Sequence, residues 1–456
     1  DATTTAVEEV LPATYREAHN LWPIHRALEQ IHQPNDHHSL QRARRRFIYQ
    51  ELLVMQLALA RRRWLLTHEH SAPPLPTSTE IDSRIQRLFP FSLTADQRLA
   101  IEDVCRDMAR SIPMNRLLQG DVGSGKTVIA EYAMLLAVAH GHQAVLMAPT
   151  EVLARQHWRT LSSDLQNSKV RMALLTGTLS AAQRRENLAA LEQGDVDLVI
   201  GTQAVLQDTV RFSRLGLVVI DEQHRFGVNQ RAALRQSGMD PHYLVMTATP
   251  IPRTVAMTLY GDLEVSTLKT LPPGRQPVHT QLANSNQRDQ WWSFFCEQLR
   301  TGRQGFVVVP RVEETDEEIA SVEATFEQLA NGPLEAFRLG LIHGRLSGEE
   351  KDATMRAFSA GQLQVLIATS VIEVGINVPN ATVMTIENGD RFGLAQLHQL
   401  RGRVRRGKHP GYVCVFVPDD ASVVDARLEA FANSTNGFEL AEKDFQLRGP
   451  GNLFGA

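Results

Sequence analysis

Cysteine is scarce in this chain of 456 residues, which contains only Cys105, Cys296 and Cys414. The three lie far apart in the sequence, so they fit neither a disulfide framework nor a zinc site. Such cysteine usage favours a reducing cytoplasm as the compartment. The 16 histidines do not change this interpretation, because none has metal-ligand spacing to a cysteine or lies in an H-E-x-x-H pattern.

Long apolar runs and a strong net charge are absent too. No apolar run approaches the ~18 residues that span a membrane, and the first residues show no targeting pattern. We therefore expect no membrane partner. The formal net charge is -4, so a DNA-binding surface would have to be a local patch. A hydrophobic fraction of 43% is typical of globular structure, and the length predicts two to four domains.

Two proline-rich interruptions, 71–79 and 271–277, divide the chain. After each, short apolar runs alternate with helical segments, which predicts an α/β fold with parallel sheets flanked by helices. Two similar lobes joined by a hinge, with a nucleotide between them, is the architecture we expect. The predicted strands are 116–119, 144–148, 172–175, 198–200, 217–220 and 243–246 in the first series, and 305–309, 339–343, 365–368, 382–387 and 412–417 in the second.

Residues 39–67 predict a long amphipathic helix, with apolar residues at helical spacing and arginines clustered near its ends. The arginines allow two interpretations, a solvated helix face or contact with a phosphate backbone. The apolar positions are Ile48, Leu52, Met55, Leu59 and Leu66, and the arginines are Arg42, Arg44, Arg45, Arg46, Arg61, Arg62 and Arg63.

Residues 120–127 match the phosphate-loop pattern G-x-x-x-x-G-K-S/T, between a predicted strand and an apolar helical segment. This setting makes a chance glycine turn a poor alternative. Backbone N–H groups of the loop suit phosphates, Lys126 can reach the β- and γ-phosphates, and the Thr127 hydroxyl can ligate magnesium. The nucleotide-binding residues predicted here are Gly120, Gly123, Ser124, Gly125, Lys126 and Thr127.

Polar side chains follow two further predicted strands. Asp221 would hold magnesium at the end of 217–220, and Glu222 would orient and deprotonate the attacking water. Thr247 and Thr249 follow 243–246 and would emerge at the same sheet edge, where they could couple the nucleotide to a second ligand. An ordinary polar turn before Pro250 is the alternative for this threonine pair.

The segment 396–406 contains four arginines. Arg403 and Arg406 are three residues apart and share a helix face, from which they could reach across an interlobe cleft and stabilise charge on the departing phosphate. A basic surface helix is the alternative interpretation.

Together these stretches resemble the superfamily 2 helicases and, more closely, the RecG family of ATP-dependent translocases that remodel branched DNA and stalled replication forks. The resemblance runs nearly end to end. The matching segments are 118–127, 148–151, DEQHRFGV at 221–228, MTATPIPRT at 246–254, 371–375, 396–404 and 441–451.

The resemblance implies roles for residues that the chemistry alone does not assign. Gln97 would read adenine and Phe91 would stack on it, Arg403 and Arg406 become arginine fingers, and Gln399 joins the catalytic set. Gly375 and Asn377 would lie near the nucleotide, and His224 with Thr247 and Thr249 would couple the sites. The implied DNA contacts are Pro149, Thr150, Gly201, Thr202, the segment 371–375 and Arg448. Apart from Arg448, these would contact phosphates through backbone amides and hydroxyls.

The resemblance also implies an organisation and an activity. It places a helical linker region at 1–80, a RecA-like ATP-binding lobe at 81–272, a second RecA-like lobe at 273–418 and the start of a translocation motif at 419–456. The expected protein is a bacterial cytoplasmic, monomeric motor that uses ATP and Mg²⁺ on replication forks and Holliday junctions. We expect a piece of a longer protein, without the wedge domain and the distal end, which binds ATP but remodels forks poorly.

Three residues depart from the family pattern in ways that could lower the rate of ATP turnover. Arg405 stands where glycine is usual, Asn377 where aspartate is usual, and Gln203 replaces a common histidine. Arg405 and Asn377 motivate one alternative, a non-hydrolysing ATP-binding scaffold. A second alternative is a transcription-repair coupling translocase like Mfd, which shares 250–253 and 397–404, although Gln223 and the segment 449–451 favour RecG.

Overall fold

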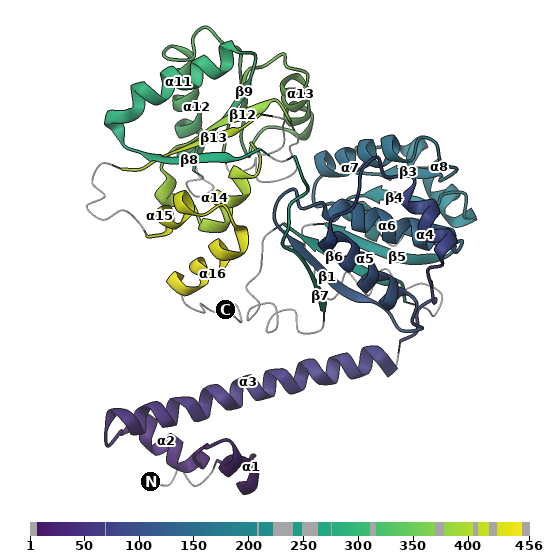
Figure 1. The fold of residues 1–456 in the computed structure, drawn as a ribbon, viewed down its shortest axis with the longest axis vertical. Coiled ribbons are helices and arrows are strands. Elements are labelled where there is room, and N and C mark those ends of the chain that lie inside the picture. The colour runs from purple at the N-terminus through teal and green to yellow at the C-terminus, as the bar shows by residue number, and fades with distance from the viewer. Residues whose placement is uncertain are drawn as a thin grey trace. The chain divides into compact units, whose positions relative to one another are not determined.

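The structure is a computed structural model, and it describes residues 7–68, 70–207, 209–221, 240–248, 263–274, 276–310, 316–369, 378–404, 409–418 and 426–448. These residues fall into two compact units that divide between residues 69 and 70. The first unit is helical, and the second contains two parallel β-sheets with their flanking helices (Figure 1).

Three helices form the described part of the first unit: α1 (Ala13–Ala18), α2 (Ile24–His32) and α3 (His37–His68). Trp22, Ala27 and Ala43 make its small core. Arg46 of α3 is completely buried, and its side chain donates hydrogen bonds to the Trp22 carbonyl and to Glu9 Oε1, both at 2.9 Å. This arginine is therefore structural, whereas the sequence pattern did not separate it from its neighbours.

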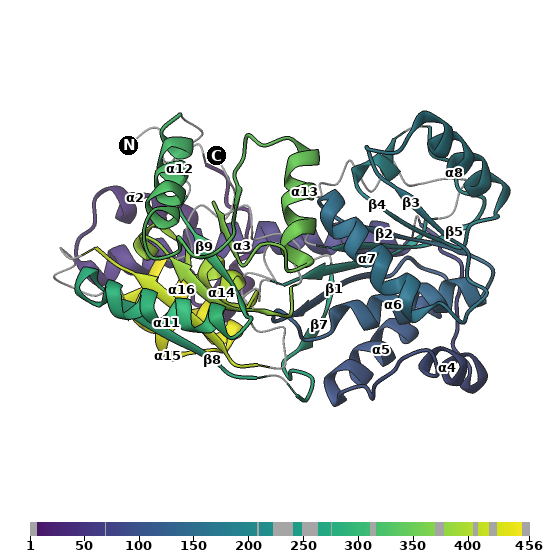
Figure 2. The ribbon, with the colours of Figure 1, turned by 90° about the horizontal axis from the view of Figure 1, so that it is seen from above.

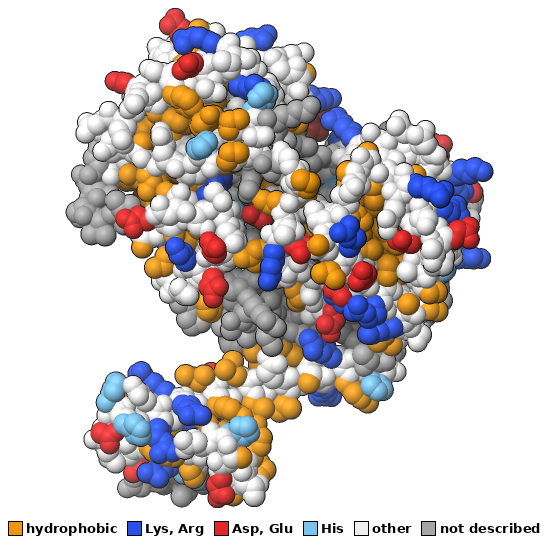
Figure 3. Space-filling model, in the orientation of Figure 1, with side chains coloured by type: hydrophobic (Ala, Val, Ile, Leu, Met, Phe, Trp, Pro, Cys, Tyr) orange, Lys and Arg blue, Asp and Glu red, His pale blue; other side chains and the backbone are white. Residues whose placement is uncertain are grey.

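The expected helix over 39–67 lies within α3, but several of its apolar side chains remain exposed. Orange side chains run along this helix in Figure 3. Within the first unit, the described core covers only the N-terminal part of α3. The exposed large apolar residues of α3 are Ile48, Leu52, Val54, Leu57 and Trp64.

The first sheet has seven parallel strands in the order β3-β4-β2-β5-β6-β1-β7. Alternate residues of the strands, such as Leu217 with Val219 and Leu244 with Met246, enter one core with helices α5 (Ala95–Met108), α6 (Lys126–Ala139) and α7 (Glu151–Asp164). The strands are β1 (Asn115–Gly120), β2 (Gln143–Met147), β3 (Met172–Leu175), β4 (Leu198–Gly201), β5 (Leu215–Asp221), β6 (His242–Thr247) and β7 (Glu264–Leu268).

The second sheet has six parallel strands in the order β10-β11-β9-β12-β13-β8, with helices on both faces (Figure 2). Phe306 and Val308 enter one core, and Val307 and Val309 enter the other. The strands are β8 (Val278–Ala283), β9 (Gln304–Val308), β10 (Leu339–Ile342), β11 (Val365–Ala368), β12 (Ala381–Ile386) and β13 (Gly411–Phe416). The helices are α11 (Arg288–Arg300), α12 (Asp316–Ala330), α13 (Gly348–Ser359), α14 (Leu394–Arg401), α15 (Ala426–Asn433) and α16 (Gly437–Arg448).

Each strand predicted from the sequence corresponds to a strand of one of these sheets, so the two-sheet α/β prediction is confirmed. The edge strands β7 and β8, next to the interruption at 271–277, were missed. The interruption at 71–79 is not a free linker either, because the Leu75 side chain is buried in the first sheet's core and its N–H donates to the Met108 carbonyl at 2.7 Å. The helix α4 (Thr79–Gln86) follows and contacts α6.

Among the described helices, none is long and apolar enough to cross a membrane.

Candidate nucleotide-binding site

The predicted site residues of the first sheet lie at one edge of it. The strands are parallel and in register, with Gln119 beside Thr247, Met147 beside Gly201 and Asp221 beside Met246. Since the carboxyl ends of parallel strands open at the same edge, the segments that follow them converge there. The phosphate loop, Asp221 and Thr247 are therefore brought together at one edge.

Glycine is required at two positions of the phosphate loop. Gly123 and Gly125 have φ values of 78° and 87°, a conformation that side chains disfavour. A Cβ at Gly125 would also lie 2.2 Å from Gln97 Nε2. Gly125 is the N-cap of α6, so the loop delivers the chain directly into a helix N-terminus, where backbone N–H groups favour an anion.

The polar groups of the loop fit a bound phosphate chain. Lys126 Nζ donates to the carbonyls of Gly120 at 2.7 Å and Asp121 at 3.0 Å, which holds the ammonium beside the loop. The Ser124 side chain is buried, and its Oγ has no hydrogen-bond partner among the described residues. A cation held within the loop and an unpaired buried hydroxyl both suit an incoming anion.

Gln97 is joined to the loop from helix α5. Its Nε2 donates to the Ser124 carbonyl at 3.0 Å, and its Oε1 accepts from the Thr94 N–H at 2.9 Å as part of a capping box. Both ends of the carboxamide thus have protein partners, so reading adenine would require one bond to be shared or released. Phe91 is 54% exposed and stacks on Phe89 with ring centroids 6.0 Å apart, which leaves an open ring for a base.

Asp221 has a partner that the sequence did not reveal. Its Oδ2 lies 2.7 Å from Nε2 of His157, a buried residue of α7. An ionised carboxylate only accepts hydrogen bonds, so the imidazole is the donor. Thr127 and Asp221 would hold Mg²⁺, and His157 would orient the carboxylate from behind. In the part of the chain that the structure describes, no group of three or more histidine, cysteine or acidic side chains forms a metal site.

The predicted DNA-contact residues of the first sheet follow strands β2 and β4. Pro149 and Thr150 follow β2, and Thr150 is the N-cap of α7, where its hydroxyl accepts from the Leu153 N–H at 3.4 Å. Gly201 ends β4, and a Cβ there would lie 2.5 Å from the Leu175 carbonyl oxygen. Thr202 caps the short 3-10 helix that follows. Both hydroxyls therefore already serve local structure.

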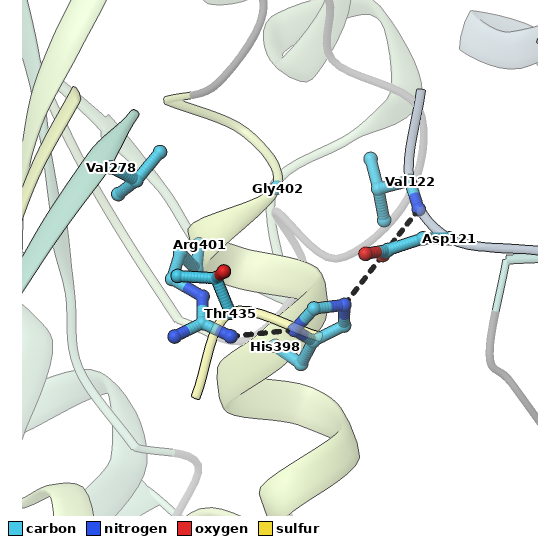
Figure 4. Close-up of a pocket in the computed structure, with 7 residues that line it drawn as sticks. All are labelled: Asp121, Val122, Val278, His398, Arg401, Gly402 and Thr435. Atoms are coloured by element: carbon cyan, nitrogen blue, oxygen red, sulfur yellow. Dashed lines mark hydrogen bonds and ion pairs between the residues drawn. The ribbon is translucent and has the colours of Figure 1, made fainter. Parts of the chain in front are cut away.

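Helix α14 reaches the phosphate loop through His398 and, at its end, Gly402, but it ends at Arg401, so the prediction that Arg403 lies on a helix face is wrong for this helix. Arg403 is buried just after the helix, and Gln399 lies on it, half-buried. His398 Nε2 lies 2.5 Å from Asp121 Oδ1 of the loop, and Figure 4 shows the two side chains pointing at each other. They border a cavity of about 10 Å³, whose full lining is Asp121, Val122, Val278, His398, Arg401, Gly402 and Thr435.

Several predicted residues lie outside the described part of the chain, and their roles stay predictions. They are Glu222, His224, Thr249, Gly375, Asn377, Arg405 and Arg406. Arg448 ends α16, but its side chain is not among the described ones.

Glu131, on the helix that follows the phosphate loop, is a buried carboxyl group that sequence reasoning did not single out. It is 2% exposed, and its Oε1 has no hydrogen-bond partner among the described residues. Burial, reinforced by the nearby Asp164, raises the pKa of Glu131 to about 8. An acidic residue inside the apolar helix 126–139 was the available signal.

The fold and the phosphate-loop site together identify the class of protein to which this chain belongs. Two parallel α/β sheets, with a phosphate loop on the first and an arginine-bearing helix of the second against it, are the arrangement of a two-lobed helicase motor core. Family models agree: residues 94–258 match the DEAD/DEAH box helicase family and residues 291–408 match the helicase conserved C-terminal domain.

Individual relatives narrow the class. The ATP-dependent DNA helicase RecG of Synechocystis sp. is 45% identical over 450 residues, which cover 98% of this chain and 54% of that protein. The Bacillus subtilis RecG is 42% identical, with 99% of this chain and 66% of that protein covered. A solved structure of RecG bound to a three-way DNA junction matches with a TM-score of 0.84 and 41% identity, covering 98% of this chain and 59% of that one.

The chain belongs to the RecG family of helicases. It spans between about half and two thirds of the length of these relatives. The resemblance to the RecG family on sequence motifs is thereby confirmed.

Proposed function

We propose that this chain is the motor of an ATP-dependent translocase that moves on duplex DNA and remodels branched DNA, including stalled forks and Holliday junctions. The observation that carries the proposal is the set of contacts at the phosphate loop. Lys126 is hydrogen-bonded to the loop backbone, and His398 of helix α14, which packs on the second sheet, contacts Asp121 of the loop. A nucleotide that changes the loop would act on both sheets, which is what a motor requires.

ATP would bind along the loop, with Mg²⁺ held by Thr127 and Asp221. The metal supplies charge neutralisation for the phosphates when it is bound. Lys126 would orient the phosphate chain, Gln97 fixes the loop through the Ser124 carbonyl, and Arg403, which follows α14, would stabilise charge on the phosphates. Glu222 and Arg406 complete the proposed catalytic set.

Branched DNA is the proposed substrate, because the matched solved RecG is bound to a three-way junction. Backbone groups at Pro149–Thr150 and Gly201–Thr202 lie at the sheet edge that carries the nucleotide site, where they would contact phosphates without reading sequence. We propose a monomeric motor in the bacterial cytoplasm.

The test is ATP hydrolysis with and without duplex and three-way-junction DNA. We expect DNA to stimulate turnover. Lys126→Ala should abolish turnover, because it removes the ammonium group that would contact the phosphates. Lys169→Ala, at an exposed lysine remote in sequence from the loop, is the matched control and should hydrolyse ATP as the unmodified chain does. Tight ATP binding without any turnover would instead support the scaffold alternative.

A coupling translocase like Mfd is not proposed, since the matched relatives are RecG proteins along 98% or more of this chain.

A further inference from the structure

We propose that His398 is a positioning residue that reports the state of the phosphate loop to helix α15 through a chain of four groups. The chain runs from the Asp121 carboxylate to the His398 imidazole, on to the Arg401 guanidinium, and ends at the Phe431 carbonyl of α15. This inference rests on nucleotide binding at the loop, as proposed above, but not on any DNA activity.

The protonation pattern of the imidazole follows from its two neighbours. Arg401 Nη2 lies 2.9 Å from His398 Nδ1, and a guanidinium can only donate, so Nδ1 is the acceptor. The proton is therefore on Nε2, which faces Asp121 Oδ1 at 2.5 Å. The neutral ring then receives one hydrogen bond and gives one, between an anion and a cation, and each bond polarises the other.

Both ends of the chain are fixed to the backbone. Asp121 Oδ1 also accepts from the Val122 N–H at 2.6 Å, within the loop. Arg401 Nη1 donates to the Phe431 carbonyl at 2.8 Å, and its guanidinium lies 4.3 Å above the Phe431 ring. A displacement of the loop backbone at Asp121 therefore reaches the backbone of α15 through side chains that are all buried.

Close packing beside the polar chain keeps the two surfaces in register. A Cβ at Gly402 would lie 2.7 Å from Val122 Cβ, so only glycine allows the end of α14 to approach the loop this closely. Figure 4 shows Gly402 and Val122 beside the histidine–aspartate pair. The contact thus combines a directional hydrogen bond with steric contact, an arrangement that responds to small shifts.

The phosphate loop contains the part that a nucleotide would move. Lys126 Nζ donates to the Asp121 carbonyl, so an ammonium that turns toward phosphates changes the hydrogen bonding of the residue that contacts His398. The loop N–H groups that bind the phosphates then order the backbone at Asp121 more than the lost bond frees it, and through His398 and Arg401 this orders α15.

The experiment measures amide hydrogen exchange in α15 with and without a non-hydrolysable ATP analogue, and the affinity for the analogue by fluorescence titration. We expect the analogue to slow exchange in 426–433 by about tenfold in the unmodified chain, within the range of known coupling energies. His398→Leu should lose this slowing, while its affinity for the analogue changes by less than about threefold.

His398→Gln supplies the rescue, because a carboxamide also carries one donor and one acceptor on a planar group and should keep the slowing. His242→Gln is the matched control: this buried histidine of β6 accepts from the Met114 N–H at 3.0 Å and faces the Pro73 carbonyl at 2.8 Å, and neither partner belongs to α14. It should leave the slowing intact.

The inference is overturned if His398→Leu still shows the slowing of amide exchange in α15. It is also overturned if the unmodified chain binds the analogue but shows no slowing. Loss in His398→Gln equal to that in His398→Leu would also overturn it. An unmodified chain that does not bind the analogue would instead contradict the proposed function.

Discussion

His157 Nε2 lies 2.7 Å from Asp221 Oδ2, although the two residues are 64 positions apart in the chain. His157 belongs to α7, the helix that begins after the proposed DNA-contact residues Pro149 and Thr150. The histidine therefore links that helix to the carboxylate proposed to hold Mg²⁺. Groups that hydrogen-bond a metal ligand from behind fix its orientation and tune its affinity.

Replacement of His157 should weaken the metal site more than the fold. We expect His157→Leu to lower the apparent affinity for Mg²⁺ by ~10-fold or more, in the range found when such partners are lost. The measurement is binding of a fluorescent ADP analogue over a series of Mg²⁺ concentrations, which does not require turnover. His157→Gln can still donate to the carboxylate and should keep most of the affinity. An unchanged Mg²⁺ dependence in His157→Leu would show that the contact does not serve the metal site.

A comparison of Gly125 with Gly141 distinguishes two reasons why a position requires glycine, backbone strain at positive φ and a steric clash of the Cβ atom. Both have positive φ, 87° and 74°, but a Cβ at Gly125 would lie 2.2 Å from Gln97 Nε2, whereas a Cβ at Gly141 meets nothing within 4 Å. Gly141→Ala should cost about 1 kcal/mol of unfolding free energy from backbone strain alone and leave nucleotide binding intact. Gly125→Ala should cost more, because Gln97 must release the Ser124 carbonyl, and should abolish binding. Urea unfolding measures the stability of each variant, and nucleotide titration measures its affinity. Equal losses in the two variants would contradict a steric clash between the new Cβ and Gln97.

The sequence predicted the central strands well because they are buried on both faces and read as continuous apolar runs. All residues of β2 and β6 are buried. The missed strand β8 has an alternating burial pattern, and β7 is exposed over its first two residues. Half-polar edge strands next to a proline-rich segment resemble loops in composition, so pattern alone did not identify them.

The individual motifs could be predicted, but their partners could not. The phosphate loop and Asp221 carry local signals, because their chemistry depends on adjacent residues and strand ends. The contact between Asp121 and His398 joins residues 277 positions apart, and nothing in either local sequence specifies the other. Such pairs are set by how the sheets and helices pack, which one sequence does not give.

Glu131 predicts a pH dependence of stability with a definite sign. Burial raises its pKa from the ordinary 4.5 to about 8, so between these values the folded chain holds a proton that the unfolded chain has released. Stability is then full below the lower value, falls as the pH rises between the two values, and has lost this contribution above the upper one. At 1.36 kcal/mol per pH unit, the loss by about pH 7 is at most about 3–4 kcal/mol.

Glu131→Gln should remove this part of the pH dependence. The variant should gain stability relative to the unmodified chain as the pH rises from about 5 to 8, when followed by urea unfolding. Asp164, whose pKa burial also raises, contributes a slope of the same sign that the variant keeps. If the two chains show parallel pH profiles, Glu131 ionises in the folded state without cost.

Arg46 and Arg44 test whether the arginines of α3 serve the fold or a nucleic acid. Arg46 is buried and bonded to Glu9 and the Trp22 carbonyl, whereas Arg44 is exposed on the same helix. Arg46→Met leaves the buried Trp22 carbonyl without its donor, whereas Glu9 keeps Arg16 at 3.1 Å, so the variant should cost about 1–3 kcal/mol of unfolding free energy. Arg44→Met should stay within about 0.5 kcal/mol.

Stability is measured by urea unfolding, monitored through the circular dichroism of the helices. Affinity for duplex DNA is measured separately, under conditions where both variants are folded. If Arg46 is purely structural, its replacement leaves that affinity unchanged, and any weakening by Arg44→Met assigns the phosphate contact to the exposed face. A stable Arg46→Met variant with weakened DNA binding would reverse the assignment, because a buried side chain cannot reach a phosphate unless the helix first gives up its contact with Glu9.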